Sequence, residues 1–151
     1  MSTRSYICIE QENKSYKRVY CHSDGYLEYN GEMLITHYNS RELAEKIIAL
    51  GNLSVLKERL YPTEGSNHNF DYDLREEGVT VAYGRDRGET GQEAHEVNYR
   101  NLDTDNCIDY TYIFTKENVW MYFKEGQLKK GLRDVADDLK LLSKKEEKNI
   151  D

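Results

Sequence analysis

The sequence predicts a single α+β domain with a mostly antiparallel sheet of about five strands and two to three helices. Two stretches of alternating apolar and polar residues, each broken by a turn signal, predict β-hairpins over residues 4–22 and 109–124. Between them, apolar residues recur at helical spacing after Gly31 and again after Ser40. The order of strand pair, helices, single strand, strand pair and helix is typical of an α+β fold.

Capping and turn residues set the expected element boundaries in the first half of the chain. Asp24 and Gly25 end the first hairpin, because Asp side chains bond nearby backbone and Gly accepts positive φ. Ser40 is expected to cap a helix with an apolar stripe, and Gly51 to end it. Residues 52–56 predict one further helical turn.

The second half of the chain alternates between loops and short elements. Residues 61–77, which contain the only proline, predict a loop. Residues 78–83 predict a short strand, and a glycine-punctuated loop follows over residues 84–91. Residues 92–106 are polar and are expected to be irregular.

A helix over about residues 126–143 is expected to complete the domain, which spans residues 1–143, with residues 144–151 as a charged tail. Its apolar residues form a narrow seam at steps of four and three, typical of a coiled-coil contact. The seam is explained either by packing on the sheet or by pairing with a second copy, and we take homodimerisation as the expectation. The interface candidates are Leu128, Leu132, Val135, Leu139 and Leu142.

The composition narrows the functional class. Hydrophobic residues make up 38% of the chain and charged residues 32%, and no apolar run is long enough for a membrane helix. The amino terminus has no apolar core of a signal peptide, and three scattered cysteines argue against a disulfide framework. The expectation is therefore a cytoplasmic protein without a membrane partner.

The net charge of −7 bears on partners. Proteins that wrap nucleic acid usually neutralise phosphates with a basic surface, so direct generic binding of DNA or RNA is not expected. An acidic surface is suited to a basic protein, such as a nucleic-acid-binding one, or contributes only solubility. Thirteen tyrosines fit either a binding face or a tyrosine-rich sheet.

The segment Tyr20–Tyr26 concentrates versatile side chains in seven residues. Cys21 is a candidate nucleophile only if the fold supplies a base, since the adjacent His22 points to the opposite face of a strand. His37, His68 or His95 could be that base; the alternative is a buried structural cysteine beside a turn. No Cys or His pair has metal-ligand spacing, so neither a metal nor a cofactor is expected.

The loop Gly84–Gly91 is the stronger candidate for an anionic ligand. Its backbone amides and the forked side chains of Arg85 and Arg87 are suited to phosphate. The loop lacks the Lys-Ser/Thr ending of a P-loop. The competing interpretation is that Asp86 and Glu89 pair with these arginines internally, and the sequence leaves both open.

Several of these segments resemble a set of small bacteriophage and prophage proteins, over about residues 3–123. The shared marks are a Thr-Arg-Ser start, a Tyr-Cys-His-x-Asp-Gly-Tyr turn and a Gly-Arg-Asp-Arg-Gly-Glu loop, here Thr3-Arg4-Ser5, Tyr20–Tyr26 and Gly84–Glu89. Similar proteins often have an aromatic residue after the His and a proline after the second Tyr, where this chain has Ser23 and Leu27. The resemblance implies a phage accessory origin and no mechanism.

Two functions are expected from these observations. The first is a non-enzymatic phage or prophage protein that binds and inhibits a host factor, such as a defence system, in the manner of an anti-CRISPR protein. The alternative is a protein that binds or processes a small nucleotide through the Gly84–Gly91 loop, with tyrosines stacking on the base. The binding candidates are Tyr20, His22, Asp24, Tyr26, Tyr83, Arg85, Arg87 and Glu89. The two distinctive motifs are expected to lie close together.

Overall fold

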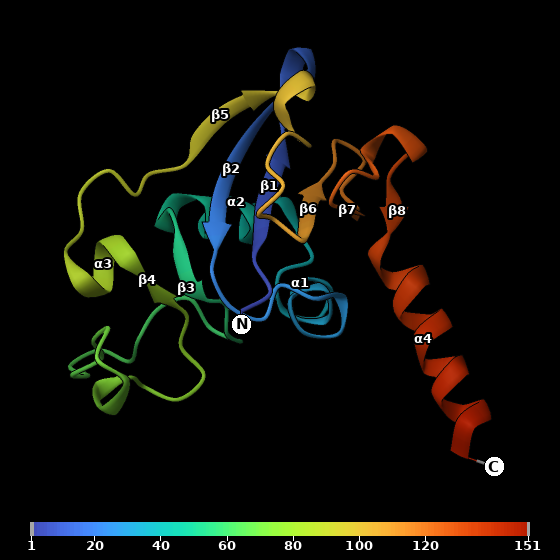
Figure 1. Ribbon diagram of the computed structural model, residues 1–151. Helices are drawn as coiled ribbons and strands as arrows, with labels where there is room; N and C mark the ends of the chain where they lie inside the picture. Colours follow the sequence, from blue (N-terminus) through green and yellow to red (C-terminus); the bar gives the residue numbers. More distant parts are fainter. Residues whose placement is uncertain (1, 151) are drawn as a thin grey trace.

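The fold is a single mixed β-sheet with helices packed mainly on one face (Figure 1). The computed structural model describes the backbone of residues 2–150 and the side chains of residues 2–145. Seven strands follow the order β4-β3-β2-β1-β6-β7-β8, and β5 pairs with β2 off this path. The strands are β1 (Ser5–Glu10), β2 (Ser15–Cys21), β3 (Leu53–Val55), β4 (Val81–Ala82), β5 (His95–Asn98), β6 (Tyr110–Phe114), β7 (Trp120–Lys124) and β8 (Arg133–Asp134).

Residues 2–150 also form four α-helices and several single turns; three of the helices lie between strands, and the fourth follows the last strand. The helices are α1 (Glu32–His37), α2 (Arg41–Leu50), α3 (Tyr83–Arg87) and α4 (Val135–Ile150). A π-helical turn at Leu27–Gly31 leads directly into α1. Short 3₁₀ turns occupy Glu12–Lys14, Tyr72–Leu74, Tyr99–Asn101 and Leu128–Lys130.

The expected sheet of about five mostly antiparallel strands is wrong. The sheet has eight strands and is mixed, because β1 pairs with β6 in parallel and β2 pairs with β3 in parallel. Three strands were missed because they carry little periodic signal: β3 and β8 are only three and two residues long, and β5 is largely exposed. The helix predicted over residues 52–56 is in fact β3 and the chain that follows it.

The two predicted hairpins and the capped helix are confirmed. Ser5 pairs with Cys21 and Glu10 with Tyr16 across β1 and β2, and β6 and β7 form the second hairpin. The Ser40 hydroxyl accepts a hydrogen bond from the amide of Leu43 at 3.2 Å, as an N-cap side chain does. The loop predicted over residues 84–91 is instead helical in its first part, as α3.

The carboxy-terminal helix begins at Val135, not at residue 126. Gly131, with φ of 95°, separates it from the turn that holds Leu128, and β8 then extends the chain along β7. Asp103 accepts hydrogen bonds from the amides of Gly126 and Leu128, which fixes this non-helical path. The helix runs on to Ile150, through most of the segment predicted as a tail.

The predicted leucine seam is therefore divided between two faces of the sheet. Leu128 is buried, and Leu132 is partly buried, in the smaller cluster. Val135 is buried in the main core, against which Leu139 and Leu142 pack. Homodimerisation through these residues stays a prediction, but packing within the domain already accounts for their spacing.

Alternate residues of the central strands supply two hydrophobic cores. Ile7 and Tyr112 face the main core, which α1, α2 and α4 cover with apolar residues. Cys8 and Ile113 face the other side, where Leu102 and the 128–130 turn close a smaller cluster. This alternation follows from the two-residue period of a β-strand.

Replacing Ser40 with Ala is expected to lower the free energy of unfolding by about 1 kcal/mol, because the first turn of α2 loses its side-chain cap. Urea denaturation measures the change. Ser40→Asp is the matched control, since Asp caps as well as Ser and should keep wild-type stability. Equal losses in both variants would contradict the capping role.

Candidate functional site

The Tyr20–Tyr26 segment forms a buried turn around Cys21 and not an open reactive site. The Cys21 side chain is buried, and Asn30 donates to its sulfur at 3.5 Å and to the Ser5 hydroxyl at 3.2 Å. Burial raises the pKa of the Cys21 thiol to about 11, although hydrogen bonds from Asn30 and the backbone oppose this shift. A thiol with such a pKa is protonated near neutral pH and is a poor nucleophile.

Gly25 explains why this turn needs a residue without a side chain. A Cβ atom at Gly25 would lie 2.8 Å from the Cβ of Ser5 and 2.9 Å from the carbonyl oxygen of Thr3. The Gly25 amide donates to that same oxygen at 2.9 Å, and the buried Tyr112 hydroxyl donates to the Gly25 carbonyl at 2.6 Å. The Thr-Arg-Ser start and the cysteine turn are thus one packed unit.

The remaining candidates in this segment point in different directions. The Tyr20 hydroxyl lies 2.7 Å from Nδ1 of His22, while the Tyr26 ring packs at a tilt against that of Tyr29 and stays 38% exposed. Asp24 has a φ of 57° and accepts a backbone hydrogen bond from Asn30 through its carbonyl. Tyr20, His22, Asp24 and Tyr26 therefore form no single cluster.

A shallow hollow of about 430 Å³ lies beside Tyr20 on the sheet face opposite the main core. Tyr6, Arg18, Tyr20 and Asn52 help to line it, and the Arg18 guanidinium lies 3.9 Å from the Tyr6 ring centroid. Burial raises the pKa of Tyr6 to about 12, with a further contribution from its hydrogen bond to an aspartate. Of the eight binding candidates, only Tyr20 lines this hollow.

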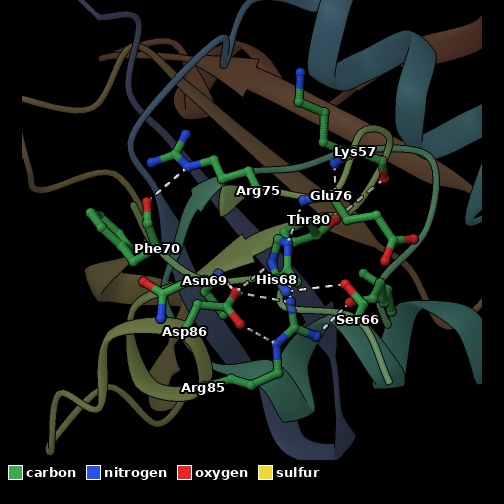
Figure 2. A network of polar contacts seen from close by, with 12 residues as sticks. Lys57, Ser66, His68, Asn69, Phe70, Arg75, Glu76, Thr80, Arg85 and Asp86 are labelled. Carbon is green, nitrogen blue, oxygen red and sulfur yellow. Dashed lines mark hydrogen bonds and ion pairs between the residues drawn. The ribbon is translucent and has the colours of Figure 1, made fainter. Parts of the chain in front are cut away.

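The first four residues of the Gly-Arg-Asp-Arg-Gly-Glu segment lie in the short helix α3, and both of its arginines bind within the chain. Figure 2 shows the contacts of Arg85. Arg85 donates to the carbonyl oxygens of Leu60 at 2.5 Å and Thr80 at 2.7 Å, and to both carboxylate oxygens of Asp86. Arg87 pairs with Glu89 at 2.5 Å. The internal ion pairs that the sequence left open as an alternative are present for both arginines.

Arg87 also packs on aromatic rings at the base of the preceding loop. Its guanidinium lies 4.3 Å from the ring centroid of Phe70 and 4.9 Å from that of Tyr83. The Phe70 and Tyr83 rings are themselves 5.5 Å apart. Tyr83 and Arg87 therefore hold the loop to α3, with Glu89 as the ionic partner of Arg87.

Asp86 is the acceptor on which several elements converge (Figure 2). Its side chain is 4% exposed and accepts from Arg85, from the amide of Ala82 at 2.8 Å and from Nε2 of His68 at 3.3 Å. Burial alone would raise the pKa of Asp86, but these hydrogen bonds and the charge of Arg85 lower it overall. The carboxylate is thus held ionised by its partners.

His68 is a structural residue that sequence reasoning considered only as a possible base. Its side chain is 1% exposed, and its Nδ1 accepts the amide hydrogen of Glu76 at 2.9 Å. Nε2 must then carry the proton and donate it to Asp86. Both ring nitrogens are engaged, which leaves none for acid–base catalysis; no sequence signal indicated these partners.

The two distinctive motifs meet at Asn52. Its side-chain oxygen accepts the amide of Tyr20 at 2.9 Å, and its carbonyl accepts the amide of Tyr83 at 3.2 Å. Asn52 also donates to Gln92, whose carbonyl approaches Gly51 so closely that a Cβ there would overlap it. The motifs are joined through structural contacts, and their functional side chains do not share a pocket in the described residues.

Sequence reasoning missed a group of large exposed side chains on the 59–79 loop. Backbone hydrogen bonds of Arg59 with Gly78 and Thr80 close this loop. Tyr61 is 53% exposed, Tyr72 81% and Leu74 51%. The signal that could have found them is the presence of large apolar residues inside a polar, acidic, proline-containing loop. Exposed tyrosines of this kind are frequent in binding surfaces.

Comparison with known proteins found no matching family model, curated protein or solved structure. The resemblance to bacteriophage proteins stays an expectation. Within residues 2–150, no helix combines the length and apolarity needed to cross a membrane. The described side chains include no group of three or more His, Cys, Asp or Glu residues placed to hold a metal ion.

In the folded protein, a thiol reagent should label Cys107 and leave Cys8 and Cys21 unmodified. Cys107 is exposed, whereas burial raises the pKa of Cys8 to about 12 and that of Cys21 to about 11. Mass spectrometry after short exposure to the reagent at neutral pH gives the number of labelled cysteines. Cys107→Ser is the control that should remove all rapid labelling. Rapid modification of Cys21 in the native protein would revive the nucleophile hypothesis.

Asp86→Asn is expected to lower the free energy of unfolding by about 2 kcal/mol, because Arg85 and His68 lose a buried charged acceptor. Since the pKa of Asp86 is lowered in the fold, its stabilisation is present above the unfolded pKa and is lost as the pH falls through the folded value. The difference between wild type and variant should therefore shrink in acid. Urea denaturation at several pH values measures this difference in the free energy of unfolding. Glu77→Gln changes an exposed carboxylate of the same loop and is the control, which should keep the stability of the wild type.

Proposed function

We propose that this protein is a non-enzymatic binding protein whose 59–79 loop contacts a partner protein with a basic surface. The observation that carries the proposal is the pairing of large exposed apolar side chains with dense negative charge on one anchored loop. Interfaces depend on a few aromatic anchors, and Tyr contributes area at little conformational cost. Tyr72, at 81% exposure, is the most exposed large apolar side chain among the described residues.

The charge of the loop sets the chemistry of the partner. Residues 61–77 contain five carboxylates and one arginine, a formal charge of −4 within a chain of −7. Glu76 is used internally, since it accepts from Arg59 and from Thr63, and these hydrogen bonds lower its pKa to about 2. The other four acids, Glu64, Asp71, Asp73 and Glu77, lie on exposed residues. Complementary charge speeds association and favours a basic partner.

Internal contacts hold the 59–79 loop in place, so little conformational entropy of the loop would be lost when it binds a partner. His68 bridges Glu76 and Asp86, and Arg75 donates to the carbonyl of Phe70 at 2.9 Å. A loop held in its bound shape loses less entropy on binding than a disordered one. The Gly-Arg-Asp-Arg-Gly-Glu segment then acts as the support of the loop and not as a ligand site.

A nucleic-acid-binding host factor fits this chemistry, because surfaces that bind phosphate are basic. Together with the resemblance to phage proteins, this motivates our proposal of a phage or prophage accessory protein that acts in the host cytoplasm and inhibits such a factor, as an anti-defence protein would. The alternative, a nucleotide site built on Arg85 and Arg87, has weaker support, because both guanidinium groups bind within the chain.

Tyr72→Ala combined with Leu74→Ala is expected to weaken partner binding about 100-fold or more while leaving the unfolding midpoint unchanged, since both side chains are exposed. The assay is recovery of the partner from host lysate at low salt, followed by titration of the purified partner. Tyr99→Ala, which removes a tyrosine 45% exposed outside the loop, is the matched control.

Protection of phage from host defence systems, measured as plating efficiency, should fall in step with partner binding. The proposal fails if no partner is recovered and no defence system is inhibited. It also fails if the loop variant and Tyr99→Ala bind the partner equally well.

A further inference from the structure

We infer that a groove along α4 binds a nucleoside phosphate, at a site separate from the 59–79 loop. The groove has a volume of about 750 Å³ and lies between α4, strands β6 and β7, and the turn Leu27–Gly31. Pockets for small organic ligands commonly have volumes of roughly 300–1,000 Å³. Arg133 of β8 lines the groove, whereas the 59–79 loop adjoins β4. These two strands lie at opposite ends of the strand order (Figure 1).

The floor of the groove is aromatic. The ring centroid of Tyr110 lies 6.1 Å from that of Tyr112, with nearly parallel planes, and 6.2 Å from that of Tyr122. Tyr110 and Tyr122 line the groove, and Tyr110 is only half-buried. A planar base can extend this row of rings by stacking on the part of Tyr110 that faces the groove.

Four cationic side chains line the groove, beside three carboxylates. The cations are Lys124, Lys130, Arg133 and Lys145. Arg133 is committed to Asp138, to which it donates at 2.5 and 3.0 Å. Among the described side chains, the three lysines make no ion pair, and Nζ of Lys124 lies 5.8 Å from the ring centroid of Tyr110. A lysine in that position can contact the phosphate of a nucleotide whose base lies against the tyrosines.

The Arg133–Asp138 pair fixes the position of α4 over this floor. Asp138 also accepts from the Tyr122 hydroxyl at 2.7 Å, which ties the first turn of the helix to β7. The hydrogen bond from Arg133, followed by those from Tyr122 and the nearby charges, lowers the pKa of Asp138 despite partial burial. The pair neutralises one of the three carboxylates in the lining and leaves Glu28 and Glu125.

The lining favours a nucleoside phosphate over a bare anion. Leu27, Leu141 and Leu142 supply apolar walls, and Leu141 is 52% exposed. Inorganic phosphate would use only the lysines. A base and ribose would use the walls and the tyrosine floor, and Glu28 can accept hydrogen bonds from an exocyclic amine.

The test is a titration of the full chain with AMP, GMP, CMP and UMP, followed by amide NMR shifts and calorimetry. At least one of them should bind with a dissociation constant of about 1 mM or tighter. It should shift the amides of Tyr110, Lys124 and Gly131. The matching nucleoside and inorganic phosphate should each bind about tenfold more weakly or not at all, because each satisfies only half of the site.

Lys124→Gln combined with Lys130→Gln should weaken nucleotide binding roughly tenfold, because two charge-assisted contacts are lost. Tyr110→Leu should weaken it similarly through loss of stacking. Lys14→Gln with Lys17→Gln, which removes two exposed lysines of the first hairpin, should leave the affinity unchanged.

The inference is overturned if no nucleotide binds the folded protein, if inorganic phosphate binds as tightly as every nucleotide, or if the Lys124/Lys130 and Lys14/Lys17 variants bind alike. Binding of nucleotide to the Tyr72/Leu74 variant with wild-type affinity is expected, so the outcome of this test is independent of the proposed partner.

Discussion

The carboxylate of Asp86 is the contact on which the arrangement of this protein's exposed loop depends. It receives hydrogen bonds from the chain at Ala82, from Arg85 in α3 and from His68 in the loop, and its side chain is almost completely buried. A buried carboxylate is stable only when its lone pairs are satisfied in this way. Arg85 in turn binds the carbonyls of Leu60 and Thr80, so one ion pair fixes both ends of a long polar segment with little apolar core of its own.

A small number of hydrogen bonds at Asn52 also joins α3, which supports the loop, to the rest of the sheet. Asn52, directly before β3, bonds to β2 at Tyr20 and to the start of α3 at Tyr83. On the far side of β2, Gly25 packs against Thr3 and Ser5 without room for a Cβ atom. The motifs that stand out in the sequence are therefore close-packed junctions of the backbone, and the surfaces available to partners lie beside them.

The sequence predicted those parts of the fold that are encoded locally. Alternating residues in the two hairpins and the Ser40 cap of α2 each act over a few neighbours, and these elements are confirmed. The parallel pairing of β1 with β6 joins residues about a hundred positions apart, and no local pattern encodes it. The role of His68 was equally hidden, because its partners come from the fold. Tyr72 and Leu74 were missed because the exposure of a side chain cannot be judged before the fold is known.

Hydrogen exchange of backbone amides in the wild-type protein tests most directly whether Asp86 and His68 hold the 59–79 loop in one conformation. The Glu76 amide donates to His68, and the Phe70 amide donates to the Asp86 carbonyl at 3.1 Å. Both should exchange at least about tenfold more slowly than the unbonded amides of an open loop. Exchange of both amides at the rate of an unstructured peptide would contradict the account, because a loop without these bonds would not present its tyrosines and carboxylates in a fixed arrangement.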